Sequence, residues 1–480
     1  RWLNGLEISE IYLGAIEKDL LRVEAEFYTI TTKSTKYSYT GESIIKKVQY
    51  GTSKELNENG DGIPTLRLNE IKDTFISEKP AKFCSKLSDA EIKSLYLRKG
   101  DVLICRTNGN ANYVGRSGIV MEDTDYIFAS YLYRIVPDLE KINSETLVAF
   151  LNSKYGREQI NKQSMQSNQV NFSPAKFRKI SIPKICTRIQ YTIAKMYSTA
   201  YTNIENANNK YSQAENLLIS ELGLENFSPS KEKVSIKTLK ESFLKTGRLD
   251  SEYYQPKYDE ILNKITKYGC SEFTNFVDSY TTGYPYSSDS YVEKDGIALI
   301  KISNINNFKL DISSASLIPK KDIDLSAENV VQKNDILVSM SGTIGNSCIV
   351  QEDIKAVVNQ RIMKIKSKNI NPVVFSLIIN SMIGKNQLER IQTGGVQANI
   401  SPKDILKIQI PCIKTSVQDE IASYIKQSME YSKKAKELLN ISTKAVEIAI
   451  DKDEQTAHNF LDRQTDRQTD RQTDRQTDRQ

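Results

Sequence analysis

The chain offers few residues that could carry out catalysis. It has 480 residues and one histidine, His458, near the C-terminal end. A Ser-His-Asp triad, a histidine general base and a histidine metal cluster are therefore excluded from its body. No G-x-x-x-x-G-K-[ST] loop is present, so we expect no ATP hydrolysis by this chain.

The six cysteines are also poorly placed for chemistry. They are scattered, with no C-x-x-C pair, at Cys84, Cys105, Cys186, Cys270, Cys348 and Cys412. This spacing argues against zinc and disulfide frameworks and favours isolated buried thiols in a reducing compartment. The sequence predicts no metal site.

Composition is that of a globular protein, with 39% hydrophobic and 26% charged residues. No run approaches the roughly 20 apolar residues that cross a bilayer, and the acidic, amphipathic first 20 residues make a poor signal peptide. We therefore expect a cytoplasmic protein. The net charge of +6 permits nucleic-acid binding, but a lysine-rich solvated surface would explain it equally well.

The elements that position any functional residues occur twice. Five segments recur in the same order, at an offset that drifts by only a few residues. The pairs are 22–28 with 248–254, 61–71 with 295–305, 99–104 with 333–338, 114–120 with 344–350, and 169–183 with 397–411. Such ordered self-similarity indicates an internal duplication.

Each repeat ends in a long segment with few Gly or Pro residues. Apolar and small residues recur there at spacings of three and four, from Thr187 and again from Thr415. This spacing predicts two long helices that pack against each other as a coiled coil. The alternative is that each helix packs on its own globular half.

The segments between the repeats' long helices are predicted to mix strands and helices. The strands are expected near 100–106, 117–121, 131–136, 334–340, 347–350 and 361–366, and the helices at 147–160 and 373–391. The predicted boundaries are 1–185 for a first globular domain, 186–225 for the first long helix as central spacer, 226–412 for a second domain, 413–456 for the second long helix as distal spacer, and 457–480 for a disordered tail.

With the repeats laid out, the chain resembles the specificity (S) subunit of type I restriction–modification systems over about residues 1–455. The resemblance rests on "GIPTLRLNEI", "LRKGDVLICRTNGNANYVGRSGIV" and "QVNFSPAKFRKISIP" in the first repeat, and on "GIALIKISNI", "NDILVSMSGTIGNSCIV" and "GGVQANISPKDILKIQIP" in the second. The Q-x-N-[FI]-S-P element, followed by Ile-Pro and a long helix, is its most specific part.

The resemblance implies an α+β fold. Two similar mixed α/β target-recognition domains are related by pseudo-two-fold symmetry and separated by two long antiparallel coiled-coil helices. Each domain would read one half of a bipartite, asymmetric double-stranded DNA site. The helices would dock two methyltransferase (M) subunits, and restriction (R) subunits would complete the complex.

The resemblance also implies a non-catalytic chain without a cofactor of its own. S-adenosylmethionine and ATP would bind to partner subunits. The residues agree, since "NPVVF" at 371–375 lacks the second proline of an Asn/Asp-Pro-Pro-aromatic methyltransferase element. Pro372 instead suits the first turn of a helix.

Candidate DNA contacts lie in polar loops, because Arg suits guanine, Asn and Gln suit adenine, and Lys, Ser and Thr suit phosphate. In the first repeat they are Tyr50, Ser53, Lys54, Arg106, Asn108, Asn110, Asn112, Arg116, Gln166, Asn168 and Gln169. In the second they are Tyr284, Tyr286, Ser287, Ser341, Thr343, Asn346, Gln360, Arg361, Thr393 and Gln397.

Asn, Gly and Ser also build turns without touching DNA, so elements common to both repeats are better explained as shared turns. Residues that differ between repeats, such as Arg106 against Ser339 or Met340, are the better candidates for specificity. We expect Arg106→Ala to alter one half-site and leave the other unchanged.

Residues 465–480 are four perfect copies of TDRQ. This neutral, polar tail cannot form a core, which predicts disorder or a frayed helix. A repeated ACAG tetranucleotide would encode TDRQ in any frame, so we hypothesise a slippage-prone tract and phase-variable expression. The alternative is an in-frame polar linker, and mixed synonymous codons in the gene would favour it.

Two other functions fit part of the sequence. A coiled-coil scaffold without DNA readout would share the helices, and a fragment of a fused methyltransferase–nuclease would share the domain-like halves. The missing cofactor and catalytic motifs argue against the second alternative.

Overall fold

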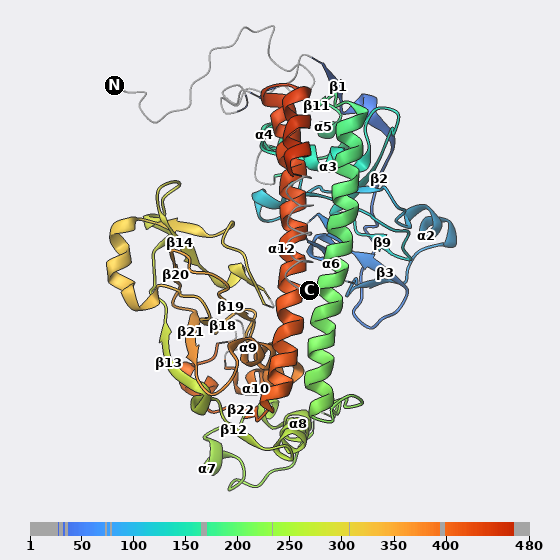
Figure 1. Cartoon of the computed structure of the whole chain (residues 1–480). Helices are drawn as coiled ribbons and strands as arrows, with labels where there is room; N and C mark the ends of the chain where they lie inside the picture. The colour runs from blue at the N-terminus through green and yellow to red at the C-terminus, as the bar shows by residue number, and fades with distance from the viewer. Residues whose placement is uncertain are drawn as a thin grey trace, which may run out of the picture. The chain divides into compact units, whose positions relative to one another are not determined.

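The computed structural model describes residues 37–464 together with 27, 32 and 33, apart from 73, 77, 78, 165–169, 233, 307 and 394–398. The chain divides into two compact units (Figure 1). Unit 1 contains residues 1–205 and 431–480, and unit 2 contains residues 206–430. Each unit therefore draws on both repeats of the sequence.

Unit 1 is built on a six-stranded sheet in the order β2-β10-β7-β8-β5-β4 and a smaller sheet in the order β6-β3-β9. The first sheet's bounds are Ile45–Tyr50, Leu132–Pro137, Val102–Cys105, Ser117–Ile119, Phe75–Ile76 and Ile71–Lys72, and the second's are Phe83–Cys84, Ile63–Leu66 and Ile127–Phe128. β1 (Ser38–Thr40) pairs with β11 (Ser181–Pro183). The short helices are α2 (Asp89–Leu95), α3 (Ser144–Asn152), α4 (Lys154–Ser164) and α5 (Pro174–Phe177).

Unit 2 repeats this plan with a four-stranded sheet in the order β13-β21-β18-β19 and a three-stranded sheet in the order β17-β14-β20. Their bounds are Val277–Thr282, Ile362–Ser367, Ile336–Ser339 and Ser347–Ile349, then Ser316–Ile318, Ile297–Ile300 and Ala356–Val358. Two further pairs are β12 (Cys270–Glu272) with β22 (Gln409–Pro411) and β15 (Ile305–Asn306) with β16 (Lys309–Leu310). The helices are α7 (Phe243–Thr246), α8 (Pro256–Thr266), the 3-10 helix η9 (Lys320–Asn329), α9 (Pro372–Asn380), α10 (Met382–Ile391) and α11 (Pro402–Ile405).

The two units share strand order and pairing sense. β2-β10-β7-β8 corresponds to β13-β21-β18-β19, and all of these neighbours are antiparallel. In the smaller sheets β3 runs parallel to β9, as β14 does to β20. The predicted pair of similar mixed α/β domains is therefore confirmed.

The helices predicted at 147–160 and 373–391 each prove to be two helices. Ser153 separates α3 from α4, and Ser381 separates α9 from α10. Both serines have extended backbones, with ψ of 162° and 172°, and both donate their hydroxyl to a carbonyl of the preceding turn. The break between helices thus occurs in both repeats. It could not be predicted from the sequence, because the apolar pattern continues through it.

The long helices are α6 (Thr187–Glu221) and α12 (Thr415–Asp451), and they pack side by side in both units (Figure 1). In unit 1 the Ser442 hydroxyl lies 3.6 Å from the Met196 sulfur. In unit 2 the Ser428 hydroxyl donates to the Ala207 carbonyl at 2.7 Å. Higher numbers in α6 thus meet lower numbers in α12, which confirms an antiparallel pair.

The apolar and small residues that recur every three or four positions form a stripe along each long helix. These stripes also pack on the globular parts. In unit 1 the buried residues Ile189 and Ile193 of α6 share one core with Phe177 of the body and with Ala435 and Val446 of α12. The two packing alternatives therefore both hold: each stripe is wide enough to cover a body and a partner helix.

Helical structure continues past α12, at 454–464. Ala457 and Leu461, four residues apart, are buried in the core of unit 1. The prediction of disorder from residue 457 is therefore wrong for 457–464, because a helical face with an apolar pair has a core to cover. The four TDRQ copies at 465–480 lie outside the described residues.

Candidate nucleic-acid interface

In unit 1, three loops leave the main sheet on the side where the ends of its central strands meet. β2 and β7 end there, while β10 and β8 begin there, as the pairings Tyr50 with Tyr133 and Cys105 with Leu132 show. The loops are 50–54, 106–116 and 129–131, and we call them the loop edge of unit 1. Because their ends are fixed by strand register, their side chains are presented on a rigid base.

Unit 2 has the same loop edge, formed by 283–287, 340–346 and 359–361. Thr282 pairs with Met363, and Ser339 pairs with Ile362. Most of the candidate residues named from the sequence therefore lie on two matching edges.

The backbone of each long loop is held from both sides. In unit 1 the Arg106 amide donates to the Tyr131 carbonyl, and the Phe172 amide donates to the Arg106 carbonyl, both at 2.8 Å. In unit 2 the amides of Met340 and Ile400 make the same two bonds, to the carbonyls of Arg361 and Met340, both at 2.9 Å. Arg106 thus corresponds to Met340, which settles the choice that the sequence left open with Ser339.

Two arginine–tyrosine pairs occupy the loop edge of unit 1. The Arg106 guanidinium carbon lies 5.5 Å from the Tyr50 ring centre, and that of Arg116 lies 4.5 Å from the Tyr113 ring centre. Tyr50 is 48% exposed and Arg116 is exposed as well. Cation–π contact orients each guanidinium without using its hydrogen-bond donors.

The loop's asparagines have mainly a turn-forming role. The Asn108 side-chain oxygen accepts from the Asn110 amide at 2.9 Å, and the Asn110 side-chain oxygen accepts from the Asn112 amide at 3.0 Å. Asn112 is exposed, with no side-chain bond to any described residue. It is therefore the freest of the three to reach a ligand.

The remaining candidates of the first repeat fall into two groups. Ser53 and Lys54 are exposed in the loop after β2, where the Lys54 amide donates to the Thr52 hydroxyl at 3.1 Å. Gln166, Asn168 and Gln169 lie outside the described residues.

The loop edge of unit 2 has different side chains. Tyr284 and Tyr286 contact edge to face, with ring centres 5.0 Å apart, and Tyr284 is 40% exposed. Gln360 and Arg361 are exposed in the loop before β21. The Ser287 hydroxyl accepts from the Asp289 amide at 3.3 Å, so it caps a turn.

The small polar residues of unit 2 are partly used within the fold. Ser341 is buried, and its hydroxyl has no partner among the described residues. Thr343 is exposed, and Asn346 is half-buried in the turn that leads into β19. Thr393 is exposed and pairs through its backbone with Asn399, while Gln397 lies outside the described residues.

Two exposed aromatic residues of unit 1 were missed by the sequence reasoning. Tyr131 is 61% exposed and Tyr113 is 39% exposed, both on the loop edge. Tyr131 holds the position that Arg361 holds in unit 2, by the matching bonds to Arg106 and Met340. Aligning 126–137 with 356–367 would have revealed it.

The "KGD" and "KND" elements at 99–101 and 333–335 are shared turns. Gly100 and Asn334 have φ of 87° and 71°, a region that favours glycine and tolerates asparagine. Asp101 and Asp335 accept from the amide three residues earlier, at 2.9 and 2.7 Å. These residues recur for folding and not for ligand contact.

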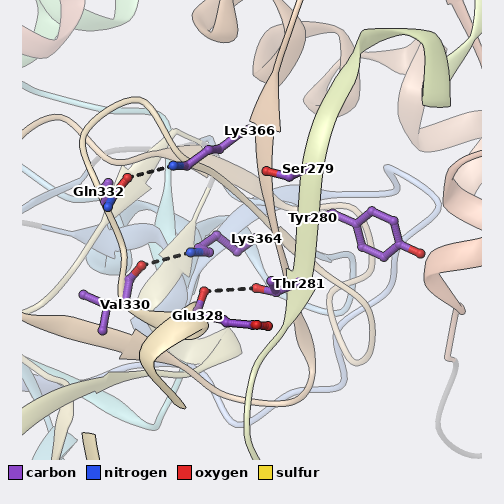
Figure 2. A pocket seen from close by; sticks show the side chains of 8 residues that line it. All are labelled: Ser279, Tyr280, Thr281, Glu328, Val330, Gln332, Lys364 and Lys366. Atoms are coloured by element: carbon purple, nitrogen blue, oxygen red, sulfur yellow. Dashed lines mark hydrogen bonds between the residues drawn. The ribbon is translucent and has the colours of Figure 1, made fainter. Parts of the chain in front are cut away.

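Unit 2 has a pocket of about 240 Å³ between β13, β21 and the end of η9 (Figure 2). Lys364 crosses it, donates to the Val330 carbonyl at 2.9 Å and lies 3.8 Å from Asp335. Burial lowers the pKa of Lys364 and raises the pKa of Asp335. This ion pair is too long to offset the burial of its two charges fully.

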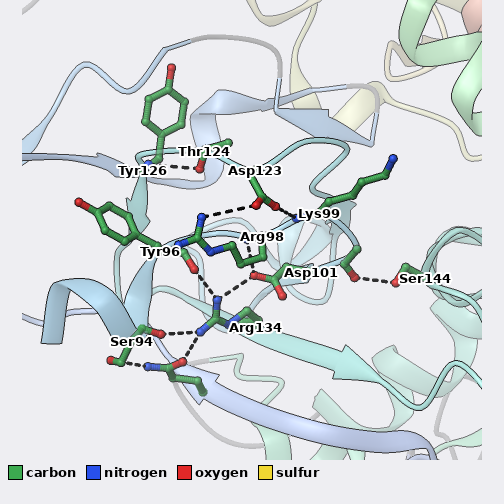
Figure 3. A network of polar contacts seen from close by, with 12 residues as sticks. Ser94, Tyr96, Arg98, Lys99, Asp101, Asp123, Thr124, Tyr126, Arg134 and Ser144 are labelled. Carbon is green, nitrogen blue, oxygen red and sulfur yellow. Dashed lines mark hydrogen bonds and ion pairs between the residues drawn. The ribbon is translucent and has the colours of Figure 1, made fainter. Parts of the chain in front are cut away.

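In unit 1 the matching place is filled by Arg134 (Figure 3). Its guanidinium donates to the carbonyls of Ser94 and Tyr96 and to Asp101, each at 2.7 Å, and also to the Gln49 side chain. Both Arg134 and Asp101 are buried. The network joins α2 to the sheet behind the loop edge, so it supports that edge without forming part of it.

Among the described residues, no group of histidine, cysteine and acidic side chains could hold a metal ion. All six cysteines are unpaired thiols. Within the described part of the chain, no helix has the length and apolarity to span a membrane.

A family model matches most of the second repeat. Residues 271–440 match the model of the family described as "Type I restriction modification DNA specificity domain". A segment of 79 residues is 32% identical to the "Type I restriction enzyme EcoKI specificity subunit" of Escherichia coli (strain K12). That segment covers 16% of this chain and 17% of the relative.

Solved structures give weaker likenesses. The S subunit of a type I restriction–modification system from M. genitalium has a TM-score of 0.38 at 12% identity, covering 88% of this chain and 97% of that one. The HsdS subunit from Thermoanaerobacter tengcongensis has a TM-score of 0.28 at 11% identity, covering 87% and 97%. The assignment therefore rests on the sequence matches.

The matched family is one of DNA specificity and not of catalysis, in agreement with the prediction of a non-catalytic subunit. The first repeat shares with the matched second repeat the antiparallel strand order of its main sheet and the parallel pair of its smaller sheet. At residues 271–440 the chain thus contains a type I restriction modification DNA specificity domain.

Proposed function

We propose that each unit binds one half of a bipartite, asymmetric double-stranded DNA site through its loop edge. The observation that carries this proposal is the pair of matching edges with different side chains. Arg106 and Tyr131 stand in unit 1 where Met340 and Arg361 stand in unit 2. Equal frames with unequal donors and acceptors suit a target whose two halves differ in sequence.

Each loop edge combines the residue types that DNA binding needs. Unit 1 presents the exposed Lys54 and Arg116 for phosphates or bases, and unit 2 presents Gln360 and Arg361. The net charge of +6 favours association with a polyanion. The sequence-nominated residues remain proposed contacts, to which we add Tyr113 and Tyr131.

We further propose that α6 and α12 dock two methyltransferase subunits, and that restriction subunits join this cytoplasmic complex. S-adenosylmethionine and ATP would bind to those partners. The support is the specificity-domain match, together with helices of 35 and 37 residues, each roughly 50–55 Å long at 1.5 Å per residue.

The test is co-expression of this chain with its methyltransferase subunit, followed by mapping of methylated adenines across the host genome. We expect one bipartite motif with two different halves. The methyltransferase expressed without this chain is the control and should leave no such motif. Methylation without sequence preference would refute DNA readout and favour a scaffold, and methylation by this chain alone would identify an enzyme.

A further inference from the structure

We infer that Arg106 reads a guanine in the half-site bound by unit 1, a step that rests on the proposed function. Arg106 begins the longest loop of that edge, directly after β7. Its backbone is fixed by the two 2.8 Å bonds to Tyr131 and Phe172. A side chain that reads a base needs such a fixed origin, because small shifts would misplace its donors.

The side chain is also oriented. The Tyr50 ring supports the guanidinium at 5.5 Å, and Nε is buried. No described residue accepts a hydrogen bond from the guanidinium. The planar pair of terminal NH2 groups is thus held in place and uncommitted, which is the geometry for bidentate contact with O6 and N7 of guanine.

Arg134 in the same unit shows the contrasting case. Its terminal nitrogens donate to Ser94, Tyr96, Asp101 and Gln49, so none of them is available to a ligand. Arg98 provides a second contrast, since it lies over Tyr96 at 5.6 Å but is paired with Asp123 at 3.6 Å, away from the loop edge.

Unit 2 cannot make the same contact. Met340 takes the place of Arg106, is 7% exposed and packs in the core of unit 2. Thr282 stands opposite Met363 where Tyr50 stands opposite Tyr133, so the aromatic support is absent as well. The guanine contact therefore belongs to one half-site only.

The experiment compares methylated motifs from complexes containing the full chain or its Arg106→Gln, Arg106→Lys or Arg98→Gln variant. We expect Arg106→Gln to reduce the preference for one G·C pair in one half-site by about 5- to 150-fold and to favour A·T there. The other half-site should stay unchanged. Arg98→Gln is the matched arginine-on-tyrosine control and should leave the motif intact.

Arg106→Lys separates a base contact from a phosphate contact. Lysine keeps the charge but loses the planar pair of donors, so the preference for the G·C pair should still fall. An unchanged motif in both Arg106 variants would overturn the inference. A phosphate contact would instead weaken DNA affinity equally on all sequences. In that case the salt dependence of DNA affinity would become shallower by about one phosphate contact in Arg106→Gln and would be restored in Arg106→Lys, and this result would also overturn the inference.

The two failures are distinguishable. If the unaltered complex gives a bipartite motif that Arg106 substitutions do not change, this inference alone is wrong. If the unaltered complex gives no sequence-specific methylation, the proposed function is wrong and the inference falls with it.

Discussion

At the scale of single residues, the two units solve one packing problem differently. Arg134 and Lys364 occupy matching places on β10 and β21, each facing a buried aspartate. The fork of arginine reaches two backbone carbonyls and a carboxylate, whereas lysine reaches one carbonyl and leaves a pocket. The cost of burying the charge is therefore better offset for the guanidinium, which has all these partners, than for the ammonium, which has few.

Reciprocal substitutions test this difference. Arg134→Lys should destabilise the chain by about 2–4 kcal/mol, because charged hydrogen bonds of roughly 1.5–3 kcal/mol each are lost. Lys364→Arg should stabilise it by about 1 kcal/mol if the new fork bonds the carbonyls of Val330 and Glu328. Differential scanning calorimetry of the full chain measures both. Shifts of Tm in the same direction for the two variants would contradict the explanation.

At the scale of elements, the end of α12 is fixed by a cluster of polar contacts. Asp451 accepts hydrogen bonds from the Tyr155 hydroxyl and, at 3.0 Å each, from Lys154 and Lys33. The Tyr155 contact first, then those with Lys154 and Lys33, hold the pKa of Asp451 well below its usual range. The cluster ties the last turn of α12 to the junction of α3 and α4.

Because the pKa of Asp451 is lower in the folded chain than in the unfolded one, its contribution to stability is present above about pH 4 and is lost as the pH falls. Asp451→Asn should therefore lower the Tm at neutral pH, and the difference from the unaltered chain should shrink between about pH 4 and pH 2. Thermal unfolding across this pH range measures it. Asp125→Asn, at an exposed aspartate of unit 1, is the control. A difference that does not vary with pH would disprove the role of the charge.

The sequence predicts periodic elements and repeated ones well. The long helices follow from apolar residues every three or four positions, and the strands around Asp101 and Asp335 follow from repeated hydrophobic runs. It does not predict the helix breaks, because Ser153 and Ser381 act through local hydroxyl bonds inside an apolar pattern.

The candidate interface was predictable as loops but not as individual contacts. Asn108 and Asn110 are of a residue type that can hydrogen-bond to DNA bases, yet their side-chain oxygens accept hydrogen bonds within turns. The exposure of Tyr131 could not be predicted, because its neighbours in sequence have the pattern of a strand and Tyr131 lies just before β10. Which side chains remain available depends on tertiary hydrogen bonds that residue type does not encode.

At the scale of the whole molecule, the repeat in sequence is not the unit of folding. Unit 1 takes residues 431–480 from the second repeat, and unit 2 takes residues 206–221 of α6 from the first. In unit 1 the borrowed segment supplies eight buried core residues, namely Ala435, Leu438, Leu439, Ala445, Val446, Ile450, Ala457 and Leu461. Neither repeat alone can complete its core.

A fragment of residues 1–226 should therefore expose the apolar stripe of α6 and form a dimer or larger species by itself, since it lacks the covering helix. Co-expressed with a fragment of residues 227–464, it should form a one-to-one complex. Size-exclusion chromatography with light scattering distinguishes these states. A stable, folded monomer of the first fragment would show that the borrowed helix is dispensable.

The exchange of helices suggests how such a chain arose. A half-length ancestor could complete its core only by pairing with an identical copy, so each mutation in a loop would have appeared in both halves of the pair. Fusion of two gene copies ended that constraint, because each half could then mutate or recombine by itself. We infer that the helix shared between units descends from such a homodimer, which would explain why one half has an arginine where the other has a methionine.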